Sequence, residues 1–251
     1  MKKQIVKWIH RAGYDLVKKP ADPLREYRHE PEFCALHVLC SPYTMTSIER
    51  MYALYQSVRY VLANDIPGSF VECGVWRGGS AMLMAKMLAD RGIRDRKLYL
   101  YDTFEGMSPP TTQDVDFRGR KADGLLEKHA DQKETSVWCL ADLNEVKHNM
   151  GKTGWAESNI VYVEGKVEDT IPSRLPEAPI ALLRLDTDWY ESTRHEMLHL
   201  FPMLIQRGVL IIDDYGHWEG CRKAIDEYFK NEKINMMLQR IDYTGRVGIN
   251  I

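Results

Sequence analysis

Residues 181–193, ALLRLDTDWYEST, and residues 208–216, GVLIIDDYG, each lead from a short apolar run into a cluster of aspartates. The runs at 180–185 and 209–212 are bounded by turn residues, which is typical of strands buried on both faces of a parallel sheet. Neighbouring parallel strands end at the same edge of a sheet, where open α/β folds bind their ligands. We therefore expect four carboxylates to meet at this edge: Asp186, Asp188, Asp213 and Asp214.

Four carboxylates this close repel one another unless a cation lies between them. Oxygen-only ligands suit Mg²⁺ or another hard divalent ion. Acidic residues also end many strands simply as helix caps or turn formers. Two clusters at two strand ends favour a metal or ligand site over that simpler explanation.

Composition narrows the class of protein. The chain has 251 residues, of which 44% are hydrophobic, and a formal net charge of -2, so we expect a folded core and no nucleic-acid or membrane partner. The five cysteines are far apart and form no CxxC pair, which predicts free thiols in the cytoplasm. Lys7 and His10 interrupt the apolar residues of the N-terminus, so it does not resemble a signal peptide.

The second informative stretch is FVECGVWRGGSAMLMAKMLA, at residues 70–89. It predicts a strand, a glycine-rich turn and a helix, and such a turn lets a ligand approach the backbone and the helix N-terminus. The spacing differs from the Gly-x-Gly-x-x-Gly of dinucleotide enzymes. Glu72 before the turn suits the ammonium group of an amino-acid-like ligand, such as the methionine end of S-adenosylmethionine. Asp102 ends the strand predicted at 97–102, the position where such folds bind ribose hydroxyls.

The remaining segments predict alternating helices and strands. We divide the chain into an N-terminal helix and arm at 1–46, which would serve as a lid or in oligomer contacts, and a single domain at 47–251. The expected elements are a helix at 1–20, an irregular arm at 20–46, a helix from Ser47 to Asn64, a substrate loop at 103–130, helices at 134–150, 192–206 and 219–230, a strand at 160–164, and two antiparallel strands at 236–241 and 246–251.

Residues 195–199, HEMLH, match the HExxH pattern of zinc metalloproteases, with Glu219 as a conceivable third ligand. On a helical wheel, His195 and His199 lie opposite the apolar residues. We therefore interpret them as the solvated face of a helix and keep zinc proteolysis as a minor alternative.

Six segments together resemble the macrocin O-methyltransferase family (TylF/MycF type), whose members methylate sugar hydroxyls on antibiotics. They occur in the family's order and cover most of the chain between Thr44 and Phe229. The segments are TMTSIERMYALYQSVRYV at 44–61, FVECGVWRGGS at 70–80, YDTFEGM at 101–107, VEDTIP at 167–172, LRLDTDWYEST at 183–193 and IIDDYG at 211–216.

The resemblance implies a Rossmann-like class I methyltransferase fold of the α/β class. Its central sheet would be mostly parallel, with helices on both faces and a C-terminal antiparallel hairpin. It also implies S-adenosylmethionine and Mg²⁺ as cofactors, a sugar or glycoside as acceptor, and a homo-oligomer whose N-terminal segments contact the neighbouring site.

Residue roles implied by the resemblance fall into three sets. Asp188 would be the general base, and the metal ligands would be Asp186, Asp213 and Asp214. Thr44, Met45 and Thr46 match a segment that closes over the cofactor. The methionine end would contact Glu72, Gly74, Gly78, Gly79 and Ser80, the ribose Asp102, and we also assign Gly165 and Asp186 to the cofactor site.

The rival functions share only part of this pattern. A nucleoside-binding module needs no paired strand-end aspartates, and a metal-dependent hydrolase needs no glycine turn or ribose acid. A catechol-type or other non-sugar vicinal diol remains an alternative acceptor. Catechol enzymes generally carry a lysine base three residues after the first metal aspartate, and that position is Trp189 here.

Overall fold

The computed structural model describes residues 22–251, so the helix expected at 1–20 lies outside the described residues. The chain divides into two units, one ending at Cys34 and one running from Ala35 to Ile251. The boundary expected at residue 46 stays a prediction. Among the described residues, no helix has the length and apolar character needed to span a bilayer.

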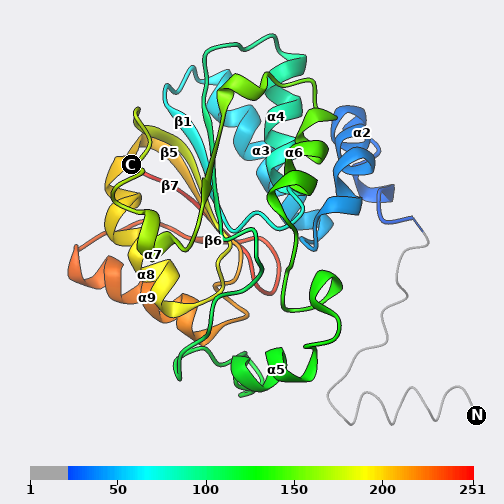
Figure 1. The fold of residues 1–251 in the computed structure, drawn as a ribbon. Coiled ribbons are helices and arrows are strands. Elements are labelled where there is room, and N and C mark those ends of the chain that lie inside the picture. The colour runs from blue at the N-terminus through cyan, green and yellow to red at the C-terminus, as the bar shows by residue number, and fades with distance from the viewer. Residues whose placement is uncertain (1–21) are drawn as a thin grey trace, which may run out of the picture. The chain divides into compact units, whose positions relative to one another are not determined.

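A seven-stranded sheet forms the centre of the second unit, in the order β3-β2-β1-β4-β5-β7-β6 (Figure 1). Strands β1 to β5 pair in parallel, and β7 pairs antiparallel with both β5 and β6. The fold class expected from the sequence is confirmed, including the C-terminal hairpin. The strand bounds are β1 Ser69–Cys73, β2 Leu98–Asp102, β3 Ile160–Glu164, β4 Ile180–Leu185, β5 Leu204–Ile212, β6 Gln239–Arg240 and β7 Arg246–Ile249.

Helices cover both faces of the sheet, with α3, α4 and α6 on one face and α7, α8 and α9 on the other (Figure 1). The α-helices are α2 Pro31–Cys40, α3 Ile48–Ala63, α4 Gly79–Asp90, α5 Ala122–Lys128, α6 Leu143–Gly151, α7 Val167–Thr170, α8 Tyr190–His199 and α9 Glu219–Asn231. Short 3-10 helices lie at Arg25–Tyr27, Ser41–Tyr43, Lys133–Thr135, Glu157–Asn159 and Phe201–Met203.

The core consists of the strands and the helix faces against them. Every residue of β1 and β4 is buried, as expected for strands that have helices on both sides. Helix α3 begins where the Ser47 side chain caps it by accepting a hydrogen bond from the Arg50 amide at 3.2 Å, at the start that the sequence predicts.

Several element bounds differ from the predictions. The arm at 20–46 was expected to be irregular, but it contains α2. This helix begins at Pro31, and proline is well tolerated in the first turn of a helix. The predicted loop at 103–130 contains α5. The helix predicted at 134–150 begins only at Leu143, because Asp142 caps it by accepting from the Glu145 amide at 2.9 Å.

The helix predicted at 192–206 is also wrong in its bounds, because α8 ends at His199. Pro202 cannot continue an α-helix, and Phe201–Met203 forms a 3-10 turn instead. Leu204 then starts β5, which is longer than the predicted strand at 209–212, and pairs with Ile180. Because Leu204 is apolar, it continues the helical pattern, and the sequence analysis therefore placed it in the helix.

Candidate methyl-transfer site

The predicted site residues come together at one edge of the sheet because the parallel strands end in register. The Gly74 amide donates to Tyr101 O at 2.9 Å, and the Asp186 amide donates to Cys73 O at 2.8 Å. Between β4 and β5, the Asp213 amide donates to Leu185 O, and between β2 and β3, the Gly165 amide donates to Asp102 O, both at 2.9 Å. The ladder therefore continues one residue beyond the strands and fixes where each loop begins.

A cavity of about 300 Å³ opens at this edge, a size at the lower end of small-molecule sites. Its walls include every predicted site residue except Gly78 and Gly79, namely Thr44, Met45, Glu72, Gly74, Ser80, Asp102, Gly165, Asp186, Asp188, Asp213 and Asp214. The sequence therefore predicted the acidic residues at the strand ends, but not the basic residues Arg50, Lys166 and Arg184 that also line the cavity.

The glycines of the turn shape this wall in different ways. Gly74 has a φ of 82°, and a Cβ there would collide with the Asp186 carbonyl oxygen. Gly78 has a φ of 90° and precedes α4. A Cβ on Gly79 would come within 2.7 Å of Thr44 Cβ, so this glycine lets the segment at 43–44 pack against α4.

Glu72 lines the cavity and has one carboxylate oxygen without a hydrogen-bond partner among the described residues. Its side chain is 1% exposed, and its Oε1 accepts from Arg184 Nη1 at 2.7 Å. Its Oε2 is buried without a hydrogen-bond partner in the part of the chain that the structure describes. Burial raises the pKa of Glu72 to about 7, against the opposing effect of Arg184. A ligand ammonium group would satisfy the unpaired oxygen, so this residue fits the methionine end of the cofactor.

Asp102 is bound by the glycine-rich turn itself. Its Oδ2 accepts from the amides of Val75 at 2.6 Å and Trp76 at 3.1 Å, and its Oδ1 accepts from the Phe104 amide at 2.8 Å. The carboxylate therefore holds the turn in shape at the cavity wall. Contact with a ribose, as the resemblance implies, stays a prediction.

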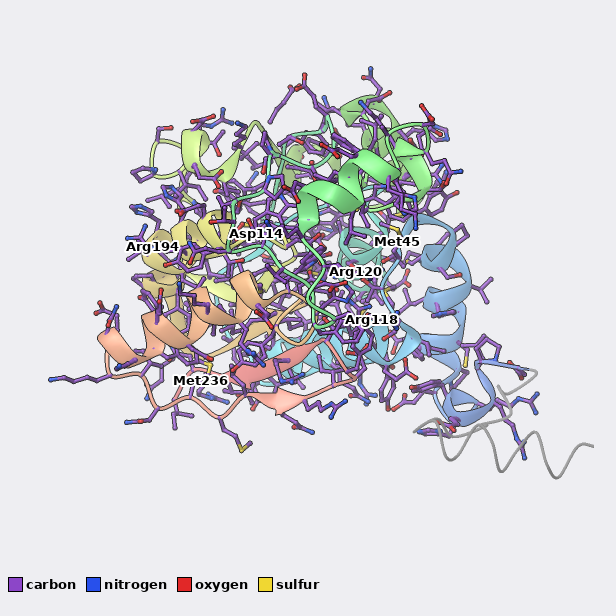
Figure 2. The ribbon with its side chains drawn as sticks, turned by 90° about the horizontal axis from the view of Figure 1, so that it is seen from below. Met45, Asp114, Arg118, Arg120, Arg194 and Met236 are labelled. Atoms are coloured by element: carbon purple, nitrogen blue, oxygen red, sulfur yellow. The ribbon has the colours of Figure 1, made fainter. Side chains whose placement is uncertain are left out.

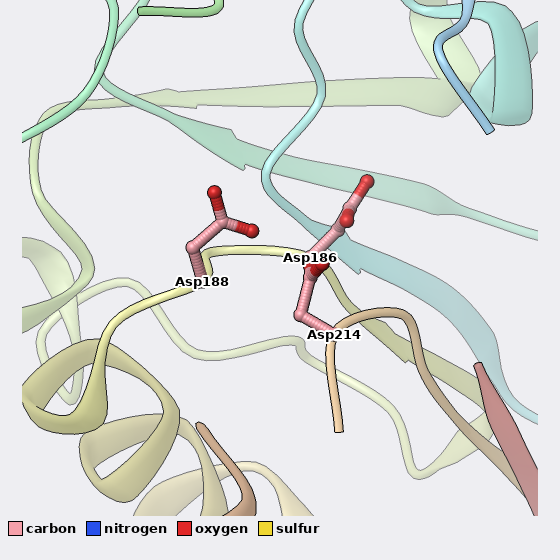
Figure 3. A group of neighbouring side chains, drawn as sticks. All are labelled: Asp186, Asp188 and Asp214. Carbon is pink, nitrogen blue, oxygen red and sulfur yellow. The ribbon is translucent and has the colours of Figure 1, made fainter. Parts of the chain in front are cut away.

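Three carboxylates meet where β4 and β5 end (Figure 3). Oxygens of Asp186, Asp188 and Asp214 all lie within 4.8 Å of one another, and no other such group of His, Cys, Asp or Glu occurs in the described chain. Asp214 Oδ2 is buried and has no partner within residues 22–251. Carboxylate oxygens this close need a proton or a cation between them, so the group fits a hard divalent ion.

Asp213 lines the same cavity but does not join this group. Its Oδ1 accepts from Arg184 Nη2 at 2.6 Å, and its Oδ2 forms an ion pair with Arg50. The two neighbouring aspartates differ because successive side chains of an extended segment face opposite sides. The metal set implied by the resemblance included Asp213, whereas the geometry places Asp188 beside Asp186 and Asp214.

Asp188 is held in an unusual backbone conformation, with a φ of 66°. Such conformations are uncommon outside glycine and often mark functional positions. The pKa of Asp188 is raised well above its usual value, first by burial and then by repulsion from Asp214 and Asp186. Burial likewise raises the pKa of Asp186 to about 8, although Arg184 opposes the rise.

Arg184 is the residue that the sequence analysis missed. Its side chain is 2% exposed, and its guanidinium contacts Glu72, Asp186, Asp213 and Thr46 at 2.6–3.0 Å. A single cation thus joins the cofactor side and the metal side of the cavity. The available signal was an arginine inside an otherwise apolar, buried strand.

The HEMLH segment does not form a metal site. His195 and His199 are half-buried neighbours on α8, with ring centroids 4.5 Å apart, and His195 Nε2 lies 2.9 Å from Ile171 O. Glu196, between them in the sequence, is fully buried and accepts from the Thr187 hydroxyl at 3.2 Å. The exposed Glu219 joins no candidate metal group in the described part of the chain.

The raised pKa values predict that stability falls as pH rises. Between the unfolded pKa of about 4 and the folded pKa, the native protein binds more protons than the unfolded chain, so the free energy of unfolding decreases. Without added metal, we expect Tm to fall between about pH 5 and pH 8. Asp188→Asn should show a smaller fall, because one of the carboxylates with a raised pKa is removed. An equal fall in both proteins, measured by calorimetry, would contradict this prediction.

Comparison with known proteins shows which family this chain resembles. The profile of the macrocin-O-methyltransferase (TylF) family matches residues 33–247. The demethyldecarbamoylnovobiocin O-methyltransferase of Streptomyces niveus is 34% identical over 203 residues, covering 81% of this chain and 74% of the relative. The 8-demethyl-8-(2,3-dimethoxy-alpha-L-rhamnosyl)-tetracenomycin-C 4'-O-methyltransferase of Streptomyces olivaceus is also 34% identical, with the same coverage.

Among solved structures, the O-methyltransferase NovP superposes with a TM-score of 0.72 at 31% identity, covering 83% of this chain and 82% of its own. The family profile spans the cavity, the carboxylate group and most of the sheet. The chain belongs to the macrocin-O-methyltransferase family.

Proposed function

We propose that this methyltransferase uses S-adenosylmethionine and Mg²⁺ to methylate a hydroxyl of a sugar or glycosylated natural product. The observation that carries the proposal is that one cavity holds both the unpaired, buried Glu72 oxygen and the three clustered carboxylates. The name of the Streptomyces olivaceus relative includes a rhamnosyl group and a 4'-O-methylation, which supports a sugar hydroxyl as the acceptor.

The cofactor would lie against β1 and β2. Glu72 would bind its ammonium group, the backbone at Gly74 would allow close approach, and Asp102 would keep the turn in shape. Bound S-adenosylmethionine supplies an electrophilic methyl group on a sulfonium. Thr44 and Met45 also line the cavity and would limit water access to the reacting atoms.

Asp186 and Asp214 would hold the divalent ion, since each offers an oxygen to the same point. A bound Mg²⁺ would make the acceptor hydroxyl more acidic and orient it. Asp188 lies beside both ligands and would accept the hydroxyl proton as the methyl group transfers. Asp213 pairs with two arginines and would hold the loop in position rather than bind the ion.

A catechol-type mechanism has less support. The position of its usual lysine base is Trp189, which is 2% exposed and donates through Nε1 to Ser108 O at 2.9 Å. This side chain therefore packs in the core instead of facing the acceptor. Homo-oligomeric assembly and a cytoplasmic location stay predictions from the sequence.

Thermal unfolding with added ligands tests the proposal. S-adenosylmethionine at about a hundredfold over its Kd should stabilise the protein by roughly 2.7 kcal/mol. Glu72→Gln should lose this shift and keep the shift produced by Mg²⁺, because it removes the charge that pairs with the ammonium group. Asp214→Asn should do the reverse. A wild-type protein that binds no S-adenosylmethionine would exclude the proposed function.

A further inference from the structure

Residues 114–122, here called the clip, form a tight loop between β2 and α5 (Figure 2). Its two carboxylates are fully buried. Asp114 Oδ2 accepts from the Thr111 amide at 2.6 Å, and its Oδ1 accepts from the Tyr190 amide at 2.8 Å. Asp116 Oδ1 accepts from the amides of Arg118 and Arg120, both at 2.9 Å. These bonds fix the path of the clip and the position of its tip.

Two backbone hydrogen bonds join the clip to the segment at the start of α9. The Phe117 amide donates to His217 O at 2.8 Å, and the Glu219 amide donates to Val115 O at 2.9 Å. Gly220 makes the close approach possible, because a Cβ there would collide with the Asp114 carboxylate. The tip of the clip therefore keeps a fixed place beside the segment that follows Asp214.

Three rings meet at this place and are here called the aromatic platform: Phe117, His217 and Tyr243. The centroid of Phe117 lies 5.3 Å from that of His217 and 5.7 Å from that of Tyr243. His217 Nδ1 lies 3.0 Å from the Tyr243 hydroxyl. Despite these contacts, Phe117 is 48% exposed and Tyr243 is 51% exposed. An ordered group of exposed rings is a surface suited to binding an apolar partner.

The platform continues the wall of the cavity. His217 and Tyr243 line the cavity, and the His217 amide donates to Asp214 O at 2.9 Å. In the sheet order β2-β1-β4-β5-β7, Glu72 and Asp102 lie on β1 and β2, whereas Tyr243 lies between β6 and β7. The carboxylates after β4 and β5 lie between these two sides. The platform is thus on the side of the carboxylates opposite the proposed cofactor site.

We infer that the aromatic platform binds an apolar ring face of the acceptor, next to the hydroxyl that is methylated. This inference rests on the proposed function. The C–H face of a deoxysugar and a flat aromatic aglycone share the chemistry that the platform offers, since both stack on π-systems. The Arg118 guanidinium lies over the Phe117 ring, 5.0 Å from its centroid, and adds a cation to the platform.

Binding of two defined glycosides tests the inference. We would titrate methyl rhamnoside and p-nitrophenyl rhamnoside into protein saturated with S-adenosylhomocysteine and Mg²⁺. Phe117→Ala should weaken binding about 3- to 10-fold, and Phe117→Tyr should restore it. The affinity for S-adenosylhomocysteine should not change in either variant. Met237→Ala, at a methionine that is 78% exposed, is the matched control and should bind like the wild type.

The two probes identify which ring lies on the platform. Weaker binding of both glycosides means that the sugar face stacks there, and weaker binding of the aryl glycoside alone means that the aglycone does. Unchanged affinities in Phe117→Ala, or no binding of either glycoside by wild-type protein that binds S-adenosylhomocysteine, would overturn the inference. Failure of wild-type protein to bind S-adenosylhomocysteine would instead count against the proposed function.

Discussion

Replacing Asp188 with asparagine is expected to lower kcat by about 10²- to 10⁴-fold, the usual contribution of a general base. Asparagine has nearly the same shape and also tolerates the left-handed backbone found at this position. It cannot accept the acceptor's proton as a carboxylate does. S-adenosylmethionine should still bind with wild-type affinity, because Glu72 and the glycine turn are unchanged. Steady-state kinetics and calorimetric titration measure the two effects separately.

The matched control is Asp95→Asn, which makes the same chemical change at an exposed position in the turn before β2. This variant should keep wild-type turnover. If Asp188→Asn also kept near wild-type turnover, Asp188 would have no role in proton transfer. If it lost affinity for S-adenosylmethionine as strongly as it lost turnover, its role would be structural.

Replacing Arg184 with methionine is expected to destabilise the protein by about 3–5 kcal/mol, the usual result of breaking a buried ion pair. For a chain of this size, this corresponds to a fall in Tm of roughly 6–20 °C. Methionine fills a similar space but leaves Glu72, Asp186 and Asp213 without the cation they share. The loss should be larger at pH 8 than at pH 5, because the carboxylates can take up protons at the lower pH.

Arg194→Met is the control, since Arg194 is exposed on α8 (Figure 2). Surface changes of this kind usually alter stability by no more than about 0.5 kcal/mol. An Arg184→Met protein with wild-type Tm would show that the buried carboxylates are protonated and need no cation. A loss independent of pH would mean that packing, not charge, explains the effect.

The strands and the carboxylate edge could be predicted from the sequence because both depend on local patterns. The apolar runs ending at Leu185 and Ile212 specify buried strands, and the parallel arrangement brings their ends together. The sequence analysis expected both Asp213 and Asp214 at the metal, whereas only Asp214 joins Asp186 and Asp188 in the structure. Which of the two joins that group depends on the positions of Arg50 and Arg184, and these come from other elements.

Arg184 could not be assigned a role from local sequence. Its partners Glu72, Thr46 and Asp213 lie 112, 138 and 29 residues away along the chain. The clip escaped prediction for a similar reason. Its shape depends on hydrogen bonds to Tyr190, His217 and Glu219, and no periodicity within 103–130 reports such distant contacts.

The contact between Gly74 and the Asp186 carbonyl has a consequence for how the two proposed ligands bind. The loop that would receive the cofactor and the loop that would hold the ion touch directly, with no side chain between them. An ion that restricts the second loop therefore also restricts the first, and so reduces the conformational entropy that cofactor binding still has to remove. Because thermodynamic linkage is reciprocal, the cofactor would strengthen ion binding by the same factor. The two ligands would then bind with positive cooperativity.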